Sequence, residues 1–182
     1  MYKILSGLTA SLNDHLRIMF RLKEDIVLLS PLKDTSGNLP TNRVSICLTG
    51  IERETAGGIS FGQRPAGQNK VGLSAPSWHL NVFVLIAVVF PEKQYGESIR
   101  ILTAIISYLQ KNTVLPLDDV DRPVSVDPVN LSSHDLSNLW SMMGISYIPS
   151  VFCRMRMLTI DEQEIIDLSA VVGEQQLDTG TV

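Results

Sequence analysis

The chain has 182 residues, of which 45% are hydrophobic, and its formal net charge is −4 at pH 7. This length suits one domain with a sizeable core, and the composition excludes a disordered chain. The mildly acidic balance and the scattered Lys and Arg residues provide no face that would track phosphates, so we expect no nucleic-acid partner.

The two cysteines, Cys47 and Cys153, lie far apart in the sequence. Two such cysteines form neither a disulfide framework nor a metal-ligand set, and they suit a reducing compartment. The first eleven residues lack the continuous apolar run of a signal peptide. The apolar run at 80–90 is too short for a membrane-spanning helix, which takes about 20 residues. We therefore expect a soluble protein, cytoplasmic when it is made, with no membrane partner.

The N-terminal part of the chain predicts a helix followed by two strands. Apolar residues at helical spacing in 4–20 predict an amphipathic helix that packs on a sheet. Its expected buried face consists of Ile4, Leu5, Leu8, Leu12, Leu16, Met19 and Phe20. The apolar run 26–29 predicts a short strand, and the turn-forming residues of 31–41 predict a loop. Alternation between apolar and polar residues in 43–54 predicts a half-buried strand, with Gly50 as a candidate bulge.

Residues 56–75 are rich in glycine and show little periodicity. A loop of this length is unusual in a compact domain, so we expect it either to be mobile or to be ordered by a partner. Arg64 and Lys70 are its charged side chains. We take both as candidate assembly-interface residues.

The glycine spacing in 62–70 matches that of a phosphate-binding P-loop, but the chemistry does not. A P-loop needs Lys and then a hydroxyl after its second glycine, and here those positions hold Gln68 and Asn69. The three histidines do not form a metal-binding pair at helical spacing, and no Gly-x-Ser-x-Gly motif is present. We therefore expect no catalytic residues, no metal site and no cofactor.

The middle of the chain predicts a central strand and a second helix. Residues 77–90 predict the longest strand, and both of its faces are apolar from Val82 onward, as in a strand covered on both sides. Residues 95–109 predict an amphipathic helix, for which Asn112 is a candidate left-handed stop. Its expected buried face consists of Tyr95, Ile99, Leu102, Ile105, Ile106 and Leu109. Residues 115–127 predict a connector with one short strand.

Residues 130–160 carry the most complete local signals in the sequence. Ser132 and Asp135 are placed to cap a helix N-terminus, and Gly144 is placed to end the helix in the left-handed conformation. The predicted buried face of this helix consists of Leu136, Leu139, Trp140 and Met143. A strand at 151–160 follows.

In that strand, Val151, Cys153, Met155 and Met157 alternate with Phe152, Arg154, Arg156 and Leu158. Arg154 and Arg156 therefore share one face, where two like charges need acidic partners or water. Two interpretations stay open, a solvated sheet face and a subunit contact, so both arginines join the candidate interface residues. Residues 164–172 predict a last strand, which would make 1–172 one domain followed by a polar tail at 173–182.

Together these elements predict an α+β domain with a mixed or mostly antiparallel sheet and helices packed on it. Its long loop and its lack of a convergent acid, base or metal set favour an interaction or structural protein over an enzyme.

Several runs resemble one family, the tail-terminator or cap proteins of extracellular contractile injection systems, which are phage-tail-like particles of the antifeeding-prophage and virulence-cassette type. The resemblance rests on the runs at 128–131, 138–140, 147–151 and 156–160, and the segments 43–54 and 76–90 match the family in order and spacing.

This resemblance implies a tail-terminator-like fold, which closes the inner tube and the contractile sheath as a homo-hexameric ring. Sheath and inner-tube proteins would be its partners, and the particle would be assembled in the cytoplasm and then released. Two alternatives remain, a baseplate or adaptor subunit of the same particle and an enzyme with an unrecognised site.

Overall fold

The computed structural model describes residues 1–34, 36–54, 62–65, 70–74, 78–115, 124–160 and 165–170. By its contacts the chain divides into two compact units. The larger unit comprises Met1–Arg53 and Leu80–Leu158, and the smaller comprises Glu54–His79 and Thr159–Val182.

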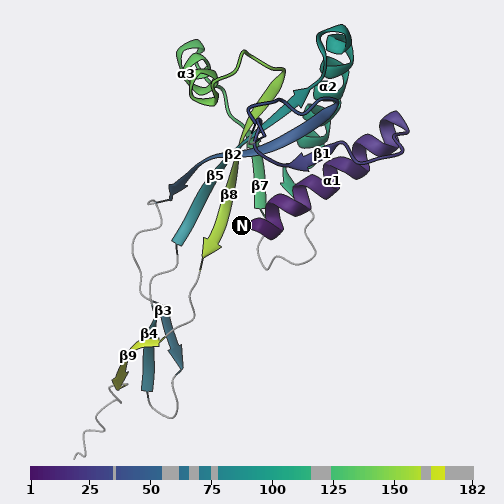
Figure 1. Ribbon diagram of the computed structural model, residues 1–182. Coiled ribbons are helices and arrows are strands. Elements are labelled where there is room, and N and C mark those ends of the chain that lie inside the picture. Colours follow the sequence, from purple (N-terminus) through teal and green to yellow (C-terminus); the bar gives the residue numbers. More distant parts are fainter. Residues whose placement is uncertain are drawn as a thin grey trace, which may run out of the picture. The chain divides into compact units, whose positions relative to one another are not determined.

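The larger unit combines three helices with a six-stranded sheet of order β1-β2-β5-β8-β7-β6 (Figure 1). The helices are α1 (Tyr2–Phe20), α2 (Tyr95–Lys111) and α3 (Ser133–Met143), and a 3₁₀ turn, η1 (Glu92–Gln94), precedes α2. The strands are β1 (Val27–Leu29), β2 (Arg43–Arg53), β5 (Trp78–Val89), β6 (Val114–Leu115), β7 (Val124–Pro128) and β8 (Ser150–Ile160). β1 pairs in parallel with β2, whereas the β2–β5, β6–β7 and β7–β8 pairs are antiparallel. The predicted α+β fold with a mixed sheet is confirmed.

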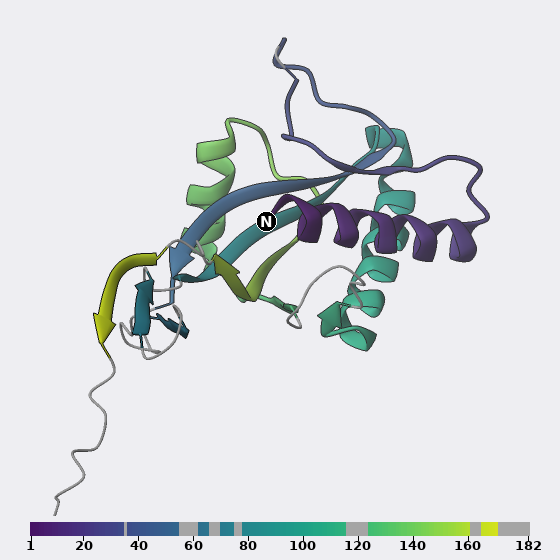
Figure 2. The ribbon, with the colours of Figure 1, turned by 90° about the horizontal axis from the view of Figure 1, so that it is seen from below.

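The sheet carries α1 and α2 on one face and α3 on the other (Figure 1 and Figure 2). Strand β5 supplies side chains to both sides, because successive residues of a strand point to opposite faces. Val84 and Ile86 lie in the core under α1 and α2, whereas Leu85 and Ala87 lie in the smaller core under α3. The predicted central strand with two apolar faces is confirmed.

Helix α1 buries Ile4, Leu5, Leu8, Leu12 and Leu16, as its periodicity predicts. Met19 is 54% exposed, so its predicted place in the buried face is wrong. Phe20, one residue further on, is partly buried and packs against the core, so the last turn of α1 faces the core with Phe20 and leaves Met19 in solvent. No helix in the described residues is both long enough and apolar enough to cross a membrane.

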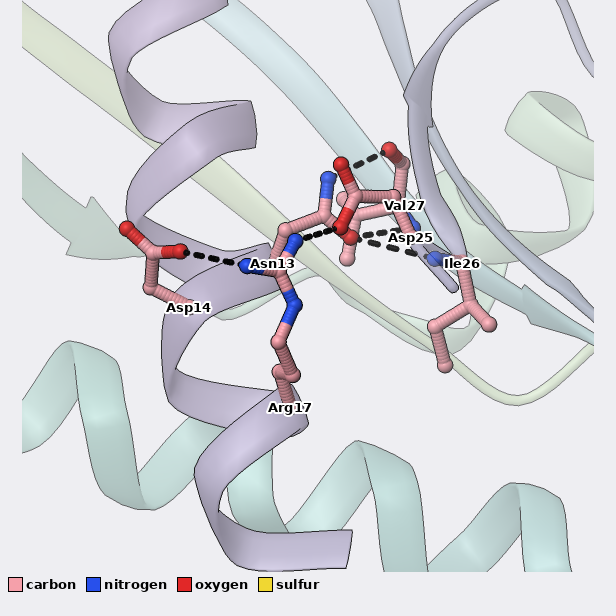
Figure 3. A network of polar contacts seen from close by, with 6 residues as sticks. All are labelled: Asn13, Asp14, Arg17, Asp25, Ile26 and Val27. Atoms are coloured by element: carbon pink, nitrogen blue, oxygen red, sulfur yellow. Dashed lines mark hydrogen bonds and ion pairs between the residues drawn. The ribbon is translucent and has the colours of Figure 1, made fainter. Parts of the chain in front are cut away.

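A buried side chain of α1, Asn13, holds the edge strand β1 in place (Figure 3). Its Oδ1 accepts hydrogen bonds from the backbone N–H groups of Ile26 (3.1 Å) and Val27 (2.8 Å), and its Nδ2 donates to the Val27 carbonyl (2.9 Å). Nearby on the surface, Arg17 binds Asp25, and this hydrogen bond raises the pKa of Arg17 above its ordinary value. Because β1 is an edge strand, the N–H and carbonyl of Val27 that face away from β2 have no strand partner, and Asn13 supplies one.

Helix α2 is rotated from its predicted orientation. Its buried face consists of Ser98, Ile101, Ala104, Ile105, Tyr108 and Leu109. Tyr95, Ile99 and Ile106, which we expected to be buried, are exposed. Apolar residues extend around much of this helix, so spacing alone does not select the buried side. Packing against α1 and the sheet selects the face with the small residues Ser98 and Ala104.

The end of α2 also differs from the prediction. Asn112 has φ −122°, so it is not the left-handed stop that we expected. Instead its side-chain Nδ2 and its backbone N–H both donate to the Tyr108 carbonyl, at 2.9 and 3.0 Å. The side chain of Asn112 thus satisfies a carbonyl at the helix end without a positive φ.

The predicted capping residues of α3 are confirmed. Ser132 Oγ accepts the Asp135 N–H (3.1 Å) and donates to Asp135 Oδ2 (2.6 Å). The helix ends at Gly144, whose φ of 63° is left-handed. Trp140 is 5% exposed and packs with Leu32 and other apolar side chains against the sheet.

The bulge expected at Gly50 is also confirmed. The β2–β5 register shifts between Leu48 and Gly50, and the hydroxyl of Thr49 donates to the Phe83 carbonyl at 3.0 Å. After α2, the connector predicted at 115–127 overlaps two strands, β6 and β7, where we expected one.

The smaller unit contains a three-stranded antiparallel sheet, β3-β4-β9. Its strands are β3 (Gly62–Pro65), β4 (Lys70–Ser74) and β9 (Ile165–Ala170). The last strand was predicted, but β3 and β4 fall in the stretch that we expected to be a structureless loop, and that expectation is wrong for these residues. Pairing with a strand distant in sequence overrides the low local strand propensity of Gly and Pro. The rest of that predicted loop and the predicted tail lie outside the described residues.

Candidate assembly surface

The side chains of β8 alternate between the two faces of the sheet, as predicted. Cys153 and Met155 are fully buried in the core under α1 and α2. Arg154 and Arg156 therefore point to the opposite face of the sheet, the face on which α3 lies. Phe152, on this same side, packs in the cluster under α3.

A single carboxylate lies between the two arginines. In the β7–β8 register Asp127 is opposite Arg154, and Ser125 is opposite Arg156. The ion pair nevertheless forms on the diagonal, with Arg156 Nε 3.2 Å from Asp127 Oδ2. The two side chains are 46% and 38% exposed, so water screens this pair.

Arg154 has no such partner within the described part of the chain. Its side chain is half-buried, and its Nε is buried without a hydrogen bond. A buried donor that is left unsatisfied costs free energy, because the group has lost water and gained nothing in exchange. The structure therefore sets Arg154 apart from Arg156, although the sequence treated them alike.

Two aromatic rings lie beside Arg154 on this face. Phe83 of β5 and Phe152 of β8 stack with their ring centroids 5.7 Å apart and an interplanar angle of 9°. Both side chains are half-buried. We call the surface formed by Phe83, Asp127, Phe152, Arg154 and Arg156 the arginine face. It combines apolar area with a guanidinium that has no carboxylate partner among the described residues.

A second feature is a hollow of about 790 Å³ beside α3. Its lining residues are Ser133, Leu136, Ser137, Trp140, Ser141, Gly144, Ile145, Ser146 and Tyr147. The Trp140 indole N–H is buried without a partner, and its ring meets Tyr147 edge-on at 5.5 Å. The lining offers hydroxyls and apolar groups but no charged side chain and no imidazole, so it provides no general base.

The thiols are protonated at neutral pH. Burial, with a smaller contribution from Asp127, raises the pKa of Cys153 to about 12, and burial also raises the pKa of Cys47. Neutral, buried thiols are poor nucleophiles and poor metal ligands. Among the side chains that the structure describes, no group of three or more His, Cys, Asp or Glu residues is placed to hold a metal ion.

The other two candidates, Arg64 and Lys70, lie on neighbouring strands of the small sheet. Arg64 on β3 is opposite Gly72, and Lys70 on β4 is opposite Ala170 of β9. They share a sheet in the smaller unit, as Arg154 and Arg156 share a strand in the larger one.

Two members of the arginine face were missed by sequence reasoning. We assigned Asp127 to a connector, although residues 124–128, which include Asp127, alternate as a strand does. Phe83 was assigned to a fully covered strand face, because a sequence pattern cannot show how much of the sheet α3 covers.

The sequence matches a known family, and the fold is similar to solved structures. Residues 4–174 match the family described as the Pvc16 N-terminal domain. The fold is similar to that of the PVC sheath/tube terminator of an extracellular contractile injection system in its extended state, with a TM-score of 0.60 and 16% identity over 95% of this chain and 63% of that one. It is also similar to the tube-terminating cap of the anti-feeding prophage, with a TM-score of 0.59 and 18% identity over 94% and 59% of the two chains.

No curated protein matches the sequence. The chain spans about three fifths of the two solved proteins. Its family membership rests on the match over residues 4–174, and the two structures agree with that match in fold. The predicted family resemblance is confirmed, and the chain belongs to the Pvc16 N-terminal domain family.

Proposed function

We propose that this protein terminates the sheath and inner tube of a contractile injection particle. The observation that carries the proposal is the family match, which extends over residues 4–174 and thus over both the sheet-and-helix unit and the strands of the smaller unit. The two similar solved structures, a sheath/tube terminator and a tube-terminating cap, support it.

The proposed mechanism is steric. Sheath and tube are open assemblies in which each ring offers the next a complementary surface, so they grow until a different subunit occupies the last ring. The terminator binds that ring with one surface and offers no matching surface on its other side. It acts as a structural component, and catalysis plays no part in this role.

We further propose that the protein acts as a homo-hexameric ring that matches the symmetry of the sheath. The isolated subunit can still be a monomer, because a weak ring contact gains effective concentration once the tube holds neighbouring copies together. In this proposal residues 1–172 act as one terminator domain followed by a tail. The particle is assembled in the cytoplasm and then released.

Three of the four candidate side chains, Arg64, Lys70 and Arg154, are contact residues in this proposal, whereas Arg156 is bound to Asp127 of its own subunit. The small sheet supports Arg64, because β3 is one of its outer strands and outer strands offer unpaired backbone groups to a partner. Lys70 lies on the neighbouring central strand, β4. For Arg154 the support is its buried Nε, which makes no hydrogen bond in the subunit.

Deletion of the protein and electron microscopy of the particles test the function. Without the terminator, sheath and tube subunits still fold, but particles should show abnormal lengths or unstable sheaths and lack density at the end opposite the baseplate. Deletion particles of normal, uniform length with an intact distal cap would contradict the proposal.

A labelled copy of the protein separates the terminator from a baseplate or adaptor subunit. A gold label on the wild-type protein should mark the end of the particle opposite the baseplate. A label at the baseplate end would instead identify a baseplate or adaptor role.

A further inference from the structure

We propose that Arg154 binds a carboxylate of another protein of the particle, on the terminal sheath or tube ring. This inference rests on the proposed function and names the chemistry of the contact. Arg154 is then the side chain of the arginine face that binds the partner, whereas Arg156 forms an ion pair within its own subunit.

The first argument is the number of charges on this face. Arg154 and Arg156 share one carboxylate, Asp127, and that carboxylate is bound by Arg156 at 3.2 Å. The residue opposite Arg154 in the register is thus already engaged. The pair of strands leaves one positive charge without a counter-charge.

The second argument is burial. Arg154 is half-buried, and its Nε is fully shielded from water without a hydrogen bond. An arginine whose only role is solubility would place its whole guanidinium in water. A planar guanidinium offers a fork of donors that matches a carboxylate in two parallel hydrogen bonds, so an acidic side chain is the partner that satisfies it best.

The third argument concerns the source of the carboxylate. The proposed function places a sheath or tube ring against this protein, which favours a different protein over a second copy, and six acidic side chains of the described residues are already engaged within the subunit. These are Asp14, Asp25, Asp34, Glu97, Asp127 and Asp135. The stacked rings of Phe83 and Phe152 add an apolar neighbourhood on the same face, so the partner segment pairs an acidic residue with an apolar one.

The test measures how the full chain binds particles purified from the deletion strain, by co-sedimentation. Arg154→Met keeps the length and apolar stem of the side chain and removes the charge. Its affinity for these particles should fall about thirtyfold or more, as is typical when one partner of a buried charge pair is removed. Arg156→Met is the matched control on the same face, and its affinity should stay within about threefold of wild type.

Arg154→Lys provides a second variant in case Arg154→Met folds poorly. It retains the charge without the planar fork, so it should bind with intermediate affinity. Self-association of each variant, followed by analytical ultracentrifugation, tests the second copy as the source of the carboxylate.

The outcomes separate this inference from the proposed function. Wild-type binding together with an unaffected, folded Arg154→Met variant overturns this inference alone. Loss of self-association with unchanged particle binding overturns the assignment of the carboxylate to another protein. Failure of the wild-type protein to bind the particles overturns the proposed function and this inference with it.

Discussion

Asp127 lies directly opposite Arg154 in the β7–β8 register, yet its carboxylate binds Arg156, two residues further along β8, at 3.2 Å. This diagonal pairing distinguishes two arginines that the sequence treats alike. It also leaves the buried Nε of Arg154 without a hydrogen bond.

The pairing predicts opposite effects of two similar substitutions on the isolated protein. Arg154→Met should raise the free energy of unfolding by about 1 kcal/mol, because an unsatisfied donor is replaced by an apolar group. Arg156→Met should leave it unchanged or lower it by at most about 1 kcal/mol, since it removes a partly exposed ion pair. Thermal melts of the two variants check this. A lower melting temperature for Arg154→Met than for Arg156→Met would show that Arg154 stabilises the subunit.

Trp140 is predicted to be a main anchor of α3. Trp140→Ala should lower the free energy of unfolding by about 3–5 kcal/mol, the usual cost of removing a large buried aromatic side chain. Trp140→Phe should cost less, because the indole N–H that it removes makes no hydrogen bond in the subunit. Denaturant titrations of both variants measure these values, and a Trp140→Ala midpoint equal to that of wild type would contradict the burial of Trp140.

Asn13 is predicted to hold β1 on the sheet. Asn13→Ala leaves the N–H groups of Ile26 and Val27 and the carbonyl of Val27 without this side chain. The expected loss is about 2–4 kcal/mol, from the cost of unsatisfied buried polar groups. Asp14→Ala is the control on the same helix, and its cost should stay within about 1 kcal/mol because its ion pair with Arg17 is exposed. Amide hydrogen exchange should show faster exchange at Val27 in Asn13→Ala alone.

Cys153 gives the stability a dependence on pH at the alkaline end. Burial raises the pKa of Cys153 from its ordinary 9.0 to about 12 in the folded protein. Folding therefore favours the protonated thiol, and this contribution is complete below about pH 9 and is lost as the pH rises to about 12. The stability difference between wild type and Cys153→Ala should shrink across this window. A constant difference would show that the thiol ionises equally in both states.

The same burial predicts the order in which the thiols react. At pH 8 a thiol reagent should modify half-buried Cys47 first, and Cys153 only as the protein unfolds. Mass spectrometry of the labelled peptides checks the order, and equal labelling of both residues in the folded protein would contradict it.

Local signals determined much of the larger unit. The hydroxyl of Ser132, the carboxylate of Asp135 and the left-handed Gly144 define α3 within a few residues, because capping involves only neighbours in the chain. Strand β5 was equally predictable, since a strand apolar on both faces has to lie between two layers. The sequence also indicated the family, through runs that reflect the packing of this core.

Tertiary structure decided what depends on distant neighbours. The buried side of α2 is selected by α1 and the sheet, because a helix that is apolar around much of its circumference has no single preferred face. Strands β3 and β4 form with β9, from the far end of the chain, although their own residues favour a loop. The same holds for the arginine face. Alternation along β8 placed Arg154 and Arg156 together, but only the contact with β7 determined that Asp127 pairs with Arg156 and that Arg154 has no carboxylate partner in the described residues.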